Sequence, residues 1–279
     1  MFKMQKFVPF YALWACVMLL VAGWGFTSCS DDEEPFLPTL PARGGSNVRS
    51  ITHLGSVPSC YDWQFTYAGK RLTKAQGVVR DPSPAIDQSY KYNSALSYQA
   101  HGVRIKNSNN EKTNVVLNAQ GYIQSMTVNR NIYNFVYNPE GRLIAWNKIV
   151  FEDSFGQAQQ YRTSASIEYE NGNFSRIVYI STDKKPVILT FTPSTWPNFN
   201  GLLPSTATLE LGCLGFEHLY YAGLLGISTE NLVQSISYEF ENSEKNYQTK
   251  FEYSLKGGNV VLCNYHTADG SAASVSYGY

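Results

Sequence analysis

The strongest constraint on the fold is that many segments after residue 60 alternate apolar and polar side chains with a period of two. In SISYEFE (235–241), the isoleucine, tyrosine and phenylalanine fall on one side, and the serines and glutamates fall on the other. KFEYSLK (250–256) divides in the same way, with Phe251, Tyr253 and Leu255 on the apolar side. Successive side chains of a strand point to opposite faces, so these segments predict antiparallel strands with one buried face.

Glycine follows the ends of several of these segments. Tyr137 leads to Gly141, and Tyr169 leads to Gly172. A glycine at positive φ is what a short hairpin turn requires. Residues 60–279 contain about 12 to 14 strand candidates, more than a flat open sheet accommodates. The sequence therefore predicts an all-β domain, a large antiparallel meander that is curled or closed into a barrel-like sheet.

One block departs from the alternation. Between Leu209 and Val233, apolar residues recur at spacings nearer three and four, bounded by glycines. This spacing predicts one short helix over residues 216–225. The preceding segment, residues 192–204, contains three prolines and a glycine. We expect it to be a long irregular loop.

The first 28 residues have the features of a secretory signal. Lys3 and Lys6 precede a segment without charged side chains, Phe7–Phe26. A segment of this length also suffices for a retained transmembrane helix. The small residues directly before Cys29 resemble the lipobox of bacterial lipoproteins, which favours cleavage there. We expect acyl chains on Cys29 to anchor the mature chain in a membrane.

The residues after Cys29 predict the location and the domain organisation. The acidic run Ser30–Glu34 is similar to the tag that directs lipoproteins of Bacteroidota to the cell surface; the alternative is a solvated charged segment. Residues 35–58 are rich in proline and glycine, which is typical of a tether. The chain then divides into a signal peptide (1–28), an acidic tag and flexible tether (29–59) and an antiparallel β domain (60–279). We expect a lipid-anchored protein of the outer membrane that faces the cell exterior.

Two resemblances support this architecture. Tyr137–Leu143 is similar to the tyrosine-aspartate repeats of Rhs-type β-shells, although Asn138 stands in place of the acid. The related tyrosines are unevenly spaced, so this likeness extends to the hairpin unit only. The strand order, the segment around Trp196 and the block ending LLGISTENLV resemble an uncharacterised family of gut Bacteroidota lipoproteins with a porin-like β fold. That resemblance covers most of residues 60–279 and implies a cell-surface setting, but no catalytic residue.

Charge and composition exclude several classes of function. The chain has 22 basic and 22 acidic residues, so no field of one sign attracts nucleic acid. The cysteines of the β domain, Cys60, Cys213 and Cys263, fit no disulfide framework and no zinc site. We expect three buried apolar side chains, with one disulfide and one remaining thiol as the alternative. No pair among the histidines has helical metal spacing; these are His53, His101, His218 and His266. We expect no cofactor and no metal.

Aromatic residues are the best candidates for binding. Trp63 and Trp146 lie in alternating segments, which predicts core packing. Trp196 lies between prolines in the predicted loop, where exposed aromatic residues often make contacts. Flat aromatic faces suit sugar rings and protein partners. The hypothesised ligand-binding residues are Trp196, Phe199, Tyr220 and Tyr221.

These features favour a non-enzymatic surface lipoprotein that binds a glycan, a peptide or a protein through the Trp196 segment and the 212–226 block. A glycan-active hydrolase is one alternative, with carboxylates from separate strands; Glu210 and Glu217 flank the block, but we interpret them as solvated caps of the helix. A barrel that itself spans the outer membrane is another, because the chain ends Tyr277-Gly278-Tyr279, like the last strand of such barrels. The polar faces of the strands would then meet lipid, which disfavours this alternative.

Overall fold

The computed structural model describes residues 46–55, 60–80, 91–99, 102–107, 112–128, 131–154, 157–182, 184–240, 246–268 and 270–279. The predicted signal peptide, the lipidation residue Cys29, the acidic run Ser30–Glu34 and His101 lie outside these residues. Within the described part of the chain, no helix has the length and hydropathy to cross a membrane.

Sixteen strands form a single sheet in these residues. In chain order they are β1 (Ser50–Gly55), β2 (Cys60–Ala68), β3 (Arg71–Arg80), β4 (Lys91–Gln99), β5 (Gly102–Asn107), β6 (Lys112–Leu117), β7 (Ile123–Val128), β8 (Asn131–Tyr137), β9 (Leu143–Ser154), β10 (Gln157–Glu170), β11 (Asn173–Ser181), β12 (Val187–Pro197), β13 (Asn231–Phe240), β14 (Tyr247–Lys256), β15 (Asn259–His266) and β16 (Ala272–Gly278). A short 3-10 helix, η1 (Ser205–Ala207), and one α-helix, α2 (Glu217–Tyr221), lie between β12 and β13.

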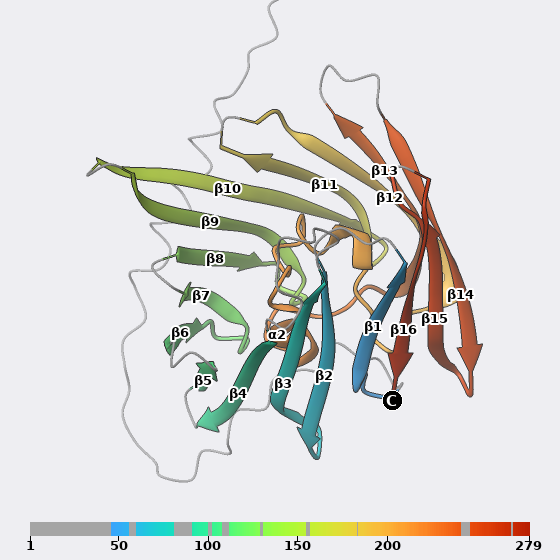
Figure 1. Ribbon diagram of the computed structural model, residues 1–279, viewed down its shortest axis with the longest axis horizontal. Coiled ribbons are helices and arrows are strands. Elements are labelled where there is room, and N and C mark those ends of the chain that lie inside the picture. Colours follow the sequence, from blue (N-terminus) through green and yellow to red (C-terminus); the bar gives the residue numbers. More distant parts are fainter. Residues whose placement is uncertain are drawn as a thin grey trace, which may run out of the picture. The chain divides into compact units, whose positions relative to one another are not determined.

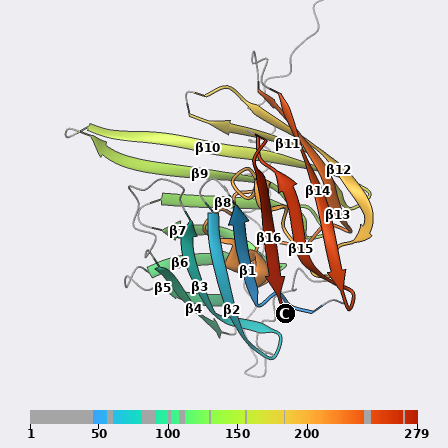
Figure 2. The ribbon, with the colours of Figure 1, turned by 45° about the vertical axis from the view of Figure 1, so that its right-hand side comes forward.

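The sheet is a closed antiparallel barrel. Each strand pairs with the next one along the chain, and β1 pairs with β16 from Ser50 opposite Gly278 to Gly55 opposite Ala273. The wall can be followed around the molecule in Figure 1 and, after a rotation, in Figure 2. The predicted all-β meander is therefore confirmed, and it is closed.

The alternation seen in the sequence sorts side chains between the inside and the outside of the barrel. On β13, Ile236 and Tyr238 are buried, and on β14 Phe251 is buried while Glu252 is exposed. Leu255, predicted on the buried face, is exposed. It is the last but one residue of β14, where the wall ends, and the extra residue of the β-bulge beside it, Val261, belongs to β15.

Tyrosine hydroxyls tie the strands together at one end of the barrel. We call this end the turn rim; there each even-numbered strand ends and the next odd-numbered strand begins. Tyr137 ends β8 and donates its hydroxyl to the carbonyl oxygen of Ile123 at the start of β7, at 2.9 Å. Such bonds recur from Tyr67 to Val48, Tyr98 to Leu72, Tyr169 to Leu143, Tyr253 to Val233 and Tyr279 to Val260. Each hydroxyl satisfies a carbonyl of the preceding odd-numbered strand or its lead-in segment.

Register shifts explain why tyrosine suits these positions. The ladder shifts beside three of these carbonyl acceptors, Leu72, Ile123 and Leu143, where the odd-numbered strand carries one extra residue. Backbone groups next to a bulge lose their ladder partner. A tyrosine hydroxyl at the end of a long side chain supplies a replacement donor inside the barrel.

Several boundaries predicted from the sequence are wrong. The predicted tether, 29–59, includes β1, whose partner β16 lies at the far end of the chain and gives no local signal. Residues 192–197 belong to β12 and not to a loop. The register with β13 shifts at Pro193 and again before Pro197, so few ladder hydrogen bonds are lost although proline has no N–H group. The helix is shorter than 216–225, because the chain turns at Gly223 with φ 77°. Fifteen of the sixteen strands begin at Cys60 or later, slightly more than expected.

The rim hydrogen bonds generate a prediction. Tyr137→Phe removes the donor to the Ile123 carbonyl and leaves a buried acceptor without its partner, which should cost about 1 to 3 kcal/mol in the free energy of unfolding. Tyr133→Phe, in the same strand, removes a hydroxyl that is not one of the rim bonds and should cost clearly less. Urea unfolding measures both. Equal losses of unfolding free energy in the two variants would show that the rim hydrogen bond contributes no more to stability than the hydroxyl of Tyr133.

Candidate functional site

Residues 198–230 connect β12 to β13 through the interior of the barrel, and we call them the plug. Figures 1 and 2 show this segment, with α2, surrounded by strands. Its buried apolar side chains are Leu202, Leu203, Ala207, Leu211, Cys213, Leu219, Tyr220, Tyr221, Ala222, Leu224 and Leu225. A segment that is apolar on all sides packs only where it is enclosed on all sides. The plug therefore supplies the centre of the hydrophobic core.

The turn rim holds the last part of the plug. Arg142 follows the turn between β8 and β9, and an N–H group of its guanidinium donates to the carbonyl oxygen of Ser228 at 2.9 Å. Its other nitrogen forms an ion pair with Glu230 at 2.9 Å. The backbone N–H of Ile123 donates to the carbonyl oxygen of Leu224 at 2.8 Å. The plug is thus bonded to strand β7 and to the β8–β9 connection.

Trp146 on β9 fits against the backbone of the plug. Its indole Nε1–H donates to the carbonyl oxygen of Glu210 at 2.7 Å. Gly212 lies at φ 68°, and a Cβ atom there would be 2.6 Å from Cδ2 of Trp146. Only glycine allows this approach and this backbone conformation together. The predicted core positions of Trp146 and Trp63 are confirmed, since they are 4% and 1% exposed.

Glu217 and His218 bring ionisable groups into the core. The indole Nε1–H of Trp63 donates to Oε2 of Glu217 at 3.1 Å, and burial raises the pKa of Glu217 to about 8. His218 stacks between Trp63 and Tyr92, with ring centroids 5.0 and 5.5 Å away. Burial lowers the pKa of His218 to about 3, so its ring is neutral at pH 7. Both residues are uncharged at neutral pH, which a dry interior requires.

The interpretation of Glu210 and Glu217 as solvated helix caps is wrong. Burial raises the pKa of Glu210 to about 7, and its Oε2 atom is buried without a hydrogen-bond partner in the described residues. The plug carries both carboxyls into the barrel because the apolar residues around them must be enclosed. Their surroundings differ: Glu217 contacts Trp63, whereas the charge of Glu210 acts on Tyr179 and Tyr238.

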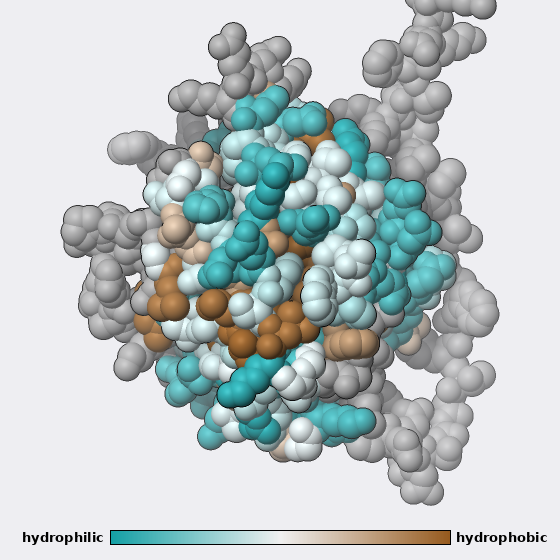
Figure 3. Space-filling model, turned by 90° about the vertical axis from the view of Figure 1, so that its right-hand side faces the viewer, coloured by the Kyte–Doolittle hydropathy of each residue, from teal (hydrophilic) through white to brown (hydrophobic). Residues whose placement is uncertain are grey.

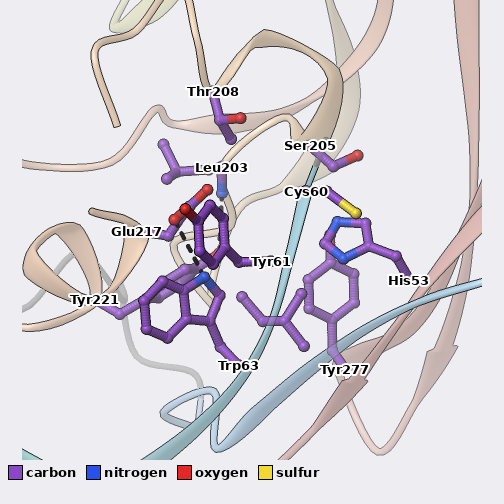
Figure 4. A pocket seen from close by; sticks show the side chains of 11 residues that line it. His53, Cys60, Tyr61, Trp63, Leu203, Ser205, Thr208, Glu217, Tyr221 and Tyr277 are labelled. Atoms are coloured by element: carbon purple, nitrogen blue, oxygen red, sulfur yellow. Dashed lines mark hydrogen bonds between the residues drawn. The ribbon is translucent and has the colours of Figure 1, made fainter. Parts of the chain in front are cut away.

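A small cavity separates the plug from strands β1, β2 and β16 (Figure 4). It has a volume of about 20 Å³, which holds roughly one or two water molecules. Glu217 and Trp63 lie toward one end of it, and His53 and Cys60 lie toward the other (Figure 4). His53 is buried and not part of a tether; its Nδ1 is 3.2 Å from Oδ1 of Asp62, and its backbone N–H donates to the same oxygen at 2.7 Å. The cavity is polar enough for water and too small for a sugar ring.

The hypothesised ligand-binding residues do not form one surface. Trp196 and Phe199 are 53% and 49% exposed, at the end of β12 and the start of the plug. Tyr220 and Tyr221 are 5% and 4% exposed in α2, where Tyr221 packs against Phe65 inside the barrel. The apolar block is enclosed by the barrel wall, so a shared recognition surface between it and the Trp196 segment is wrong.

A groove on the outer face of the barrel has the size of a ligand site. Its volume is about 370 Å³, within the range of about 300 to 1,000 Å³ typical of ligand pockets. Outward side chains of four neighbouring strands line it: Leu54 of β1, Lys250 and Glu252 of β14, Asn264 and His266 of β15, and Ala272 and Ser274 of β16. Figure 3 shows the side of the barrel on which β14 and β15 lie, mostly hydrophilic with a hydrophobic patch near the middle.

Sequence reasoning missed this groove. Most of its residues are the polar members of alternating segments, which the pattern assigns to solvent. Only the pairing of β1 with β16 brings Leu54 beside strands from the other end of the chain. The described residues contain no group of three or more histidine, cysteine or acidic side chains arranged to hold a metal ion. The thiols of Cys60, Cys213 and Cys263 are buried, as expected.

Residues 63–261 match the family model described as a domain of unknown function (DUF4595) with porin-like fold. Among solved structures, the chain is similar to a porin-like protein from Bacteroides uniformis ATCC 8492, with a TM-score of 0.61 and 19% identity, over 86% of this chain and 99% of that chain. A porin-like protein from Bacteroides vulgatus ATCC 8482 gives a TM-score of 0.46 and 11% identity over 84% and 99% of the two chains. The first likeness concerns the fold alone. No curated protein matches the chain.

From the raised pKa values of the buried carboxyl groups we predict how the free energy of unfolding depends on pH. The pKa of Glu217 rises from its ordinary value of 4.5 to about 8 in the folded chain, so between these values the unfolded chain releases a proton that the folded chain keeps. The free energy of unfolding should then fall by about 2 kcal/mol from pH 6.5 to pH 8, at about 1.4 kcal/mol per pH unit. Below about pH 6.5 the neutral His218 opposes this trend, because the unfolded histidine takes up a proton there.

Urea unfolding at pH 6.5 and pH 8 measures the effect. Glu217→Gln keeps an acceptor for the indole of Trp63 and should reduce the slope clearly; the part that remains belongs to Glu210, whose pKa is raised to about 7. Glu252→Gln, on the exposed face of β14, is the matched control and should keep the wild-type slope. A wild-type barrel that is as stable at pH 8 as at pH 6.5 would contradict the buried, protonated state of Glu217.

Proposed function

Because the chain belongs to the DUF4595 family with porin-like fold, we propose that it is a lipid-anchored outer-membrane protein whose barrel is a closed interaction module and not a channel. The filled lumen is the observation that carries this proposal. Barrels of 16 or more strands that conduct solutes enclose a water-filled channel, and the barrel diameter grows with the number of strands. In this chain the plug packs Leu219, Leu224 and their neighbours into that space.

Charged side chains on the outer face of the wall disfavour a barrel that spans the membrane. Arg162 and Glu168 are exposed on β10, and Lys250 and Glu252 are exposed on β14. A membrane-spanning barrel needs an outward apolar band about 25 Å tall, in which charged side chains are destabilising. We infer that the barrel stands in water beside the membrane and that Cys29 carries the lipid that attaches it. The acidic run after Cys29 supports display on the cell exterior.

The outer groove is the place where a partner fits best. Lys250 and Glu252 offer one charge of each sign, Asn264 offers an amide and Leu54 offers an apolar surface. This mixture suits a ligand rich in hydrogen-bonding groups, such as a glycan or a peptide. A hydrolase is disfavoured because Glu217 is buried beside a cavity with room for only one or two water molecules, and Glu210 does not line that cavity.

The proposal predicts the behaviour of the chain with and without its anchor. In cells, labelled palmitate should enter the wild-type chain and should not enter Cys29→Ala. The mature Cys29→Ala chain should stay soluble without detergent and show a β-type circular dichroism spectrum, because its apolar surface is inside the barrel. Added to planar bilayers, it should produce no conductance.

Two results would contradict the proposal in different ways. Palmitate in the Cys29→Ala chain would remove the assigned lipidation site. A Cys29→Ala chain that dissolves only in detergent, or that conducts ions, would favour the membrane-spanning barrel.

A further inference from the structure

One sector of the turn rim carries exposed aromatic and basic side chains together. Trp196 and Phe199 lie where β12 leads into the plug, 53% and 49% exposed. Lys256 ends β14, Arg49 precedes β1, and Lys70 lies between β2 and β3; all three are exposed. Strands β12 to β16 and β1 to β3 are consecutive in the closed sheet, so these residues lie along one half of the turn rim. We call these five residues the basic aromatic sector.

Two other turns of the rim carry acidic side chains. Glu140 and Glu170 are exposed at the turns that follow β8 and β10. Arg142, close to them in the sequence, is buried and paired with Glu230. With 22 basic and 22 acidic residues, the whole chain is electrically balanced. The positive charge of the sector is therefore a local feature of one side of the rim.

The chain enters the barrel at this same sector. The amide of Asn200 donates to the carbonyl oxygen of Ser46 at 3.2 Å and to Oδ1 of Asn259 at 2.8 Å. The backbone N–H of Arg49 donates to the carbonyl oxygen of Gly278 at 2.7 Å. These bonds fix Ser46 beside Phe199, the neighbour of Asn200 in the sequence. Residues 30–45 join Ser46 to Cys29 and span at most about 60 Å when fully extended.

We propose that the basic aromatic sector is a membrane-contact face, which rests on the lipid anchor proposed above. Its partner is the surface of the bilayer that holds the anchor, with anionic headgroups. Tryptophan and other aromatic side chains settle at the headgroup level, with one side in the apolar region. Lysine and arginine are attracted to anionic headgroups over about a Debye length. The tether keeps the local concentration of bilayer high, so weak contacts suffice.

The contact fixes the orientation of the barrel. Arg49, Lys70 and Lys256 face the headgroups, and Trp196 and Phe199 enter the interface. The outer groove lies toward the opposite rim, where β1 and β15 end, and so points away from the membrane. A ligand in the medium then reaches the groove without passing the bilayer.

Tryptophan quenching by brominated lipids tests the contact. Acylated protein is reconstituted in vesicles of phosphatidylethanolamine and phosphatidylglycerol with brominated acyl chains. If Cys29 proves to carry no lipid, the same mature chain is coupled through its Cys29 thiol to a maleimide lipid, so quenching is measured in either case. Flotation with the vesicles reports the anchor, and quenching reports the face. Trp63 and Trp146 are buried, so Trp196 is the exposed tryptophan of the mature chain's described residues.

We expect a quenched, blue-shifted component in the wild type that disappears in Trp196→Phe. The double variant Trp196→Phe/Ala268→Trp moves the tryptophan to the exposed turn between β15 and β16 at the opposite rim and should not be quenched. Lys70→Gln/Lys256→Gln should weaken the contact by roughly an order of magnitude in anionic vesicles. It should have little effect in vesicles of phosphatidylcholine.

Unchanged thermal midpoints of the variants establish that the barrel stays folded. A wild-type protein that floats with the vesicles but shows no quenching of Trp196 would overturn the membrane-contact face and leave the anchor intact. Equal quenching of the tryptophans at positions 196 and 268 would also overturn it, because the barrel would then have no fixed orientation.

Discussion

The width of a sixteen-strand barrel is the constraint on which the rest of the structure depends. About eight strands enclose a space that wall side chains fill, whereas a sheet twice as large leaves a lumen. This chain fills the lumen with the connection between β12 and β13. The inward aromatic residues of the wall pack against that plug, and burial of apolar surface on both sides is the main stabilising contribution. Glu217 and His218 are uncharged at pH 7 because both side chains are buried in this interior.

Much of the wall could be predicted from the sequence. Alternation in SISYEFE and the glycine turns after Tyr137 and Tyr169 identify strands and hairpins from local chemistry alone. The pairing of β1 with β16 could not be predicted, since its two strands lie more than 200 residues apart, as the register of Ser50 with Gly278 illustrates. Leu255 was predicted to be buried because it continues the apolar side of KFEYSLK, but it lies next to the end of β14, where the wall ends and no longer encloses it.

The candidate sites were harder to predict than the fold. The apolar block around Leu219 has a helical spacing, and spacing does not distinguish a helix on a surface from one enclosed by strands. Exposure of Trp196 was expected, but Arg49, Lys70 and Lys256 are distant from it in the sequence and share one half of the turn rim with it only through the order of strands in the closed sheet. The outer groove is built from polar side chains of separate strands, which individually look like ordinary solvent-facing positions.

The central claim is that plug and wall form one cooperative core, and amide hydrogen exchange tests it most directly. The N–H of Ile123 donates to the plug, and that of Ala222 lies within the plug. Ile177 lies in the wall on β11, between β10 and β12. If plug and wall open only together, the three amides exchange with the same free energy, that of global unfolding. Exchange of Ala222 and Ile123 that is much faster than that of Ile177 would show a plug that leaves the lumen while the wall stays folded, and would contradict a single cooperative core.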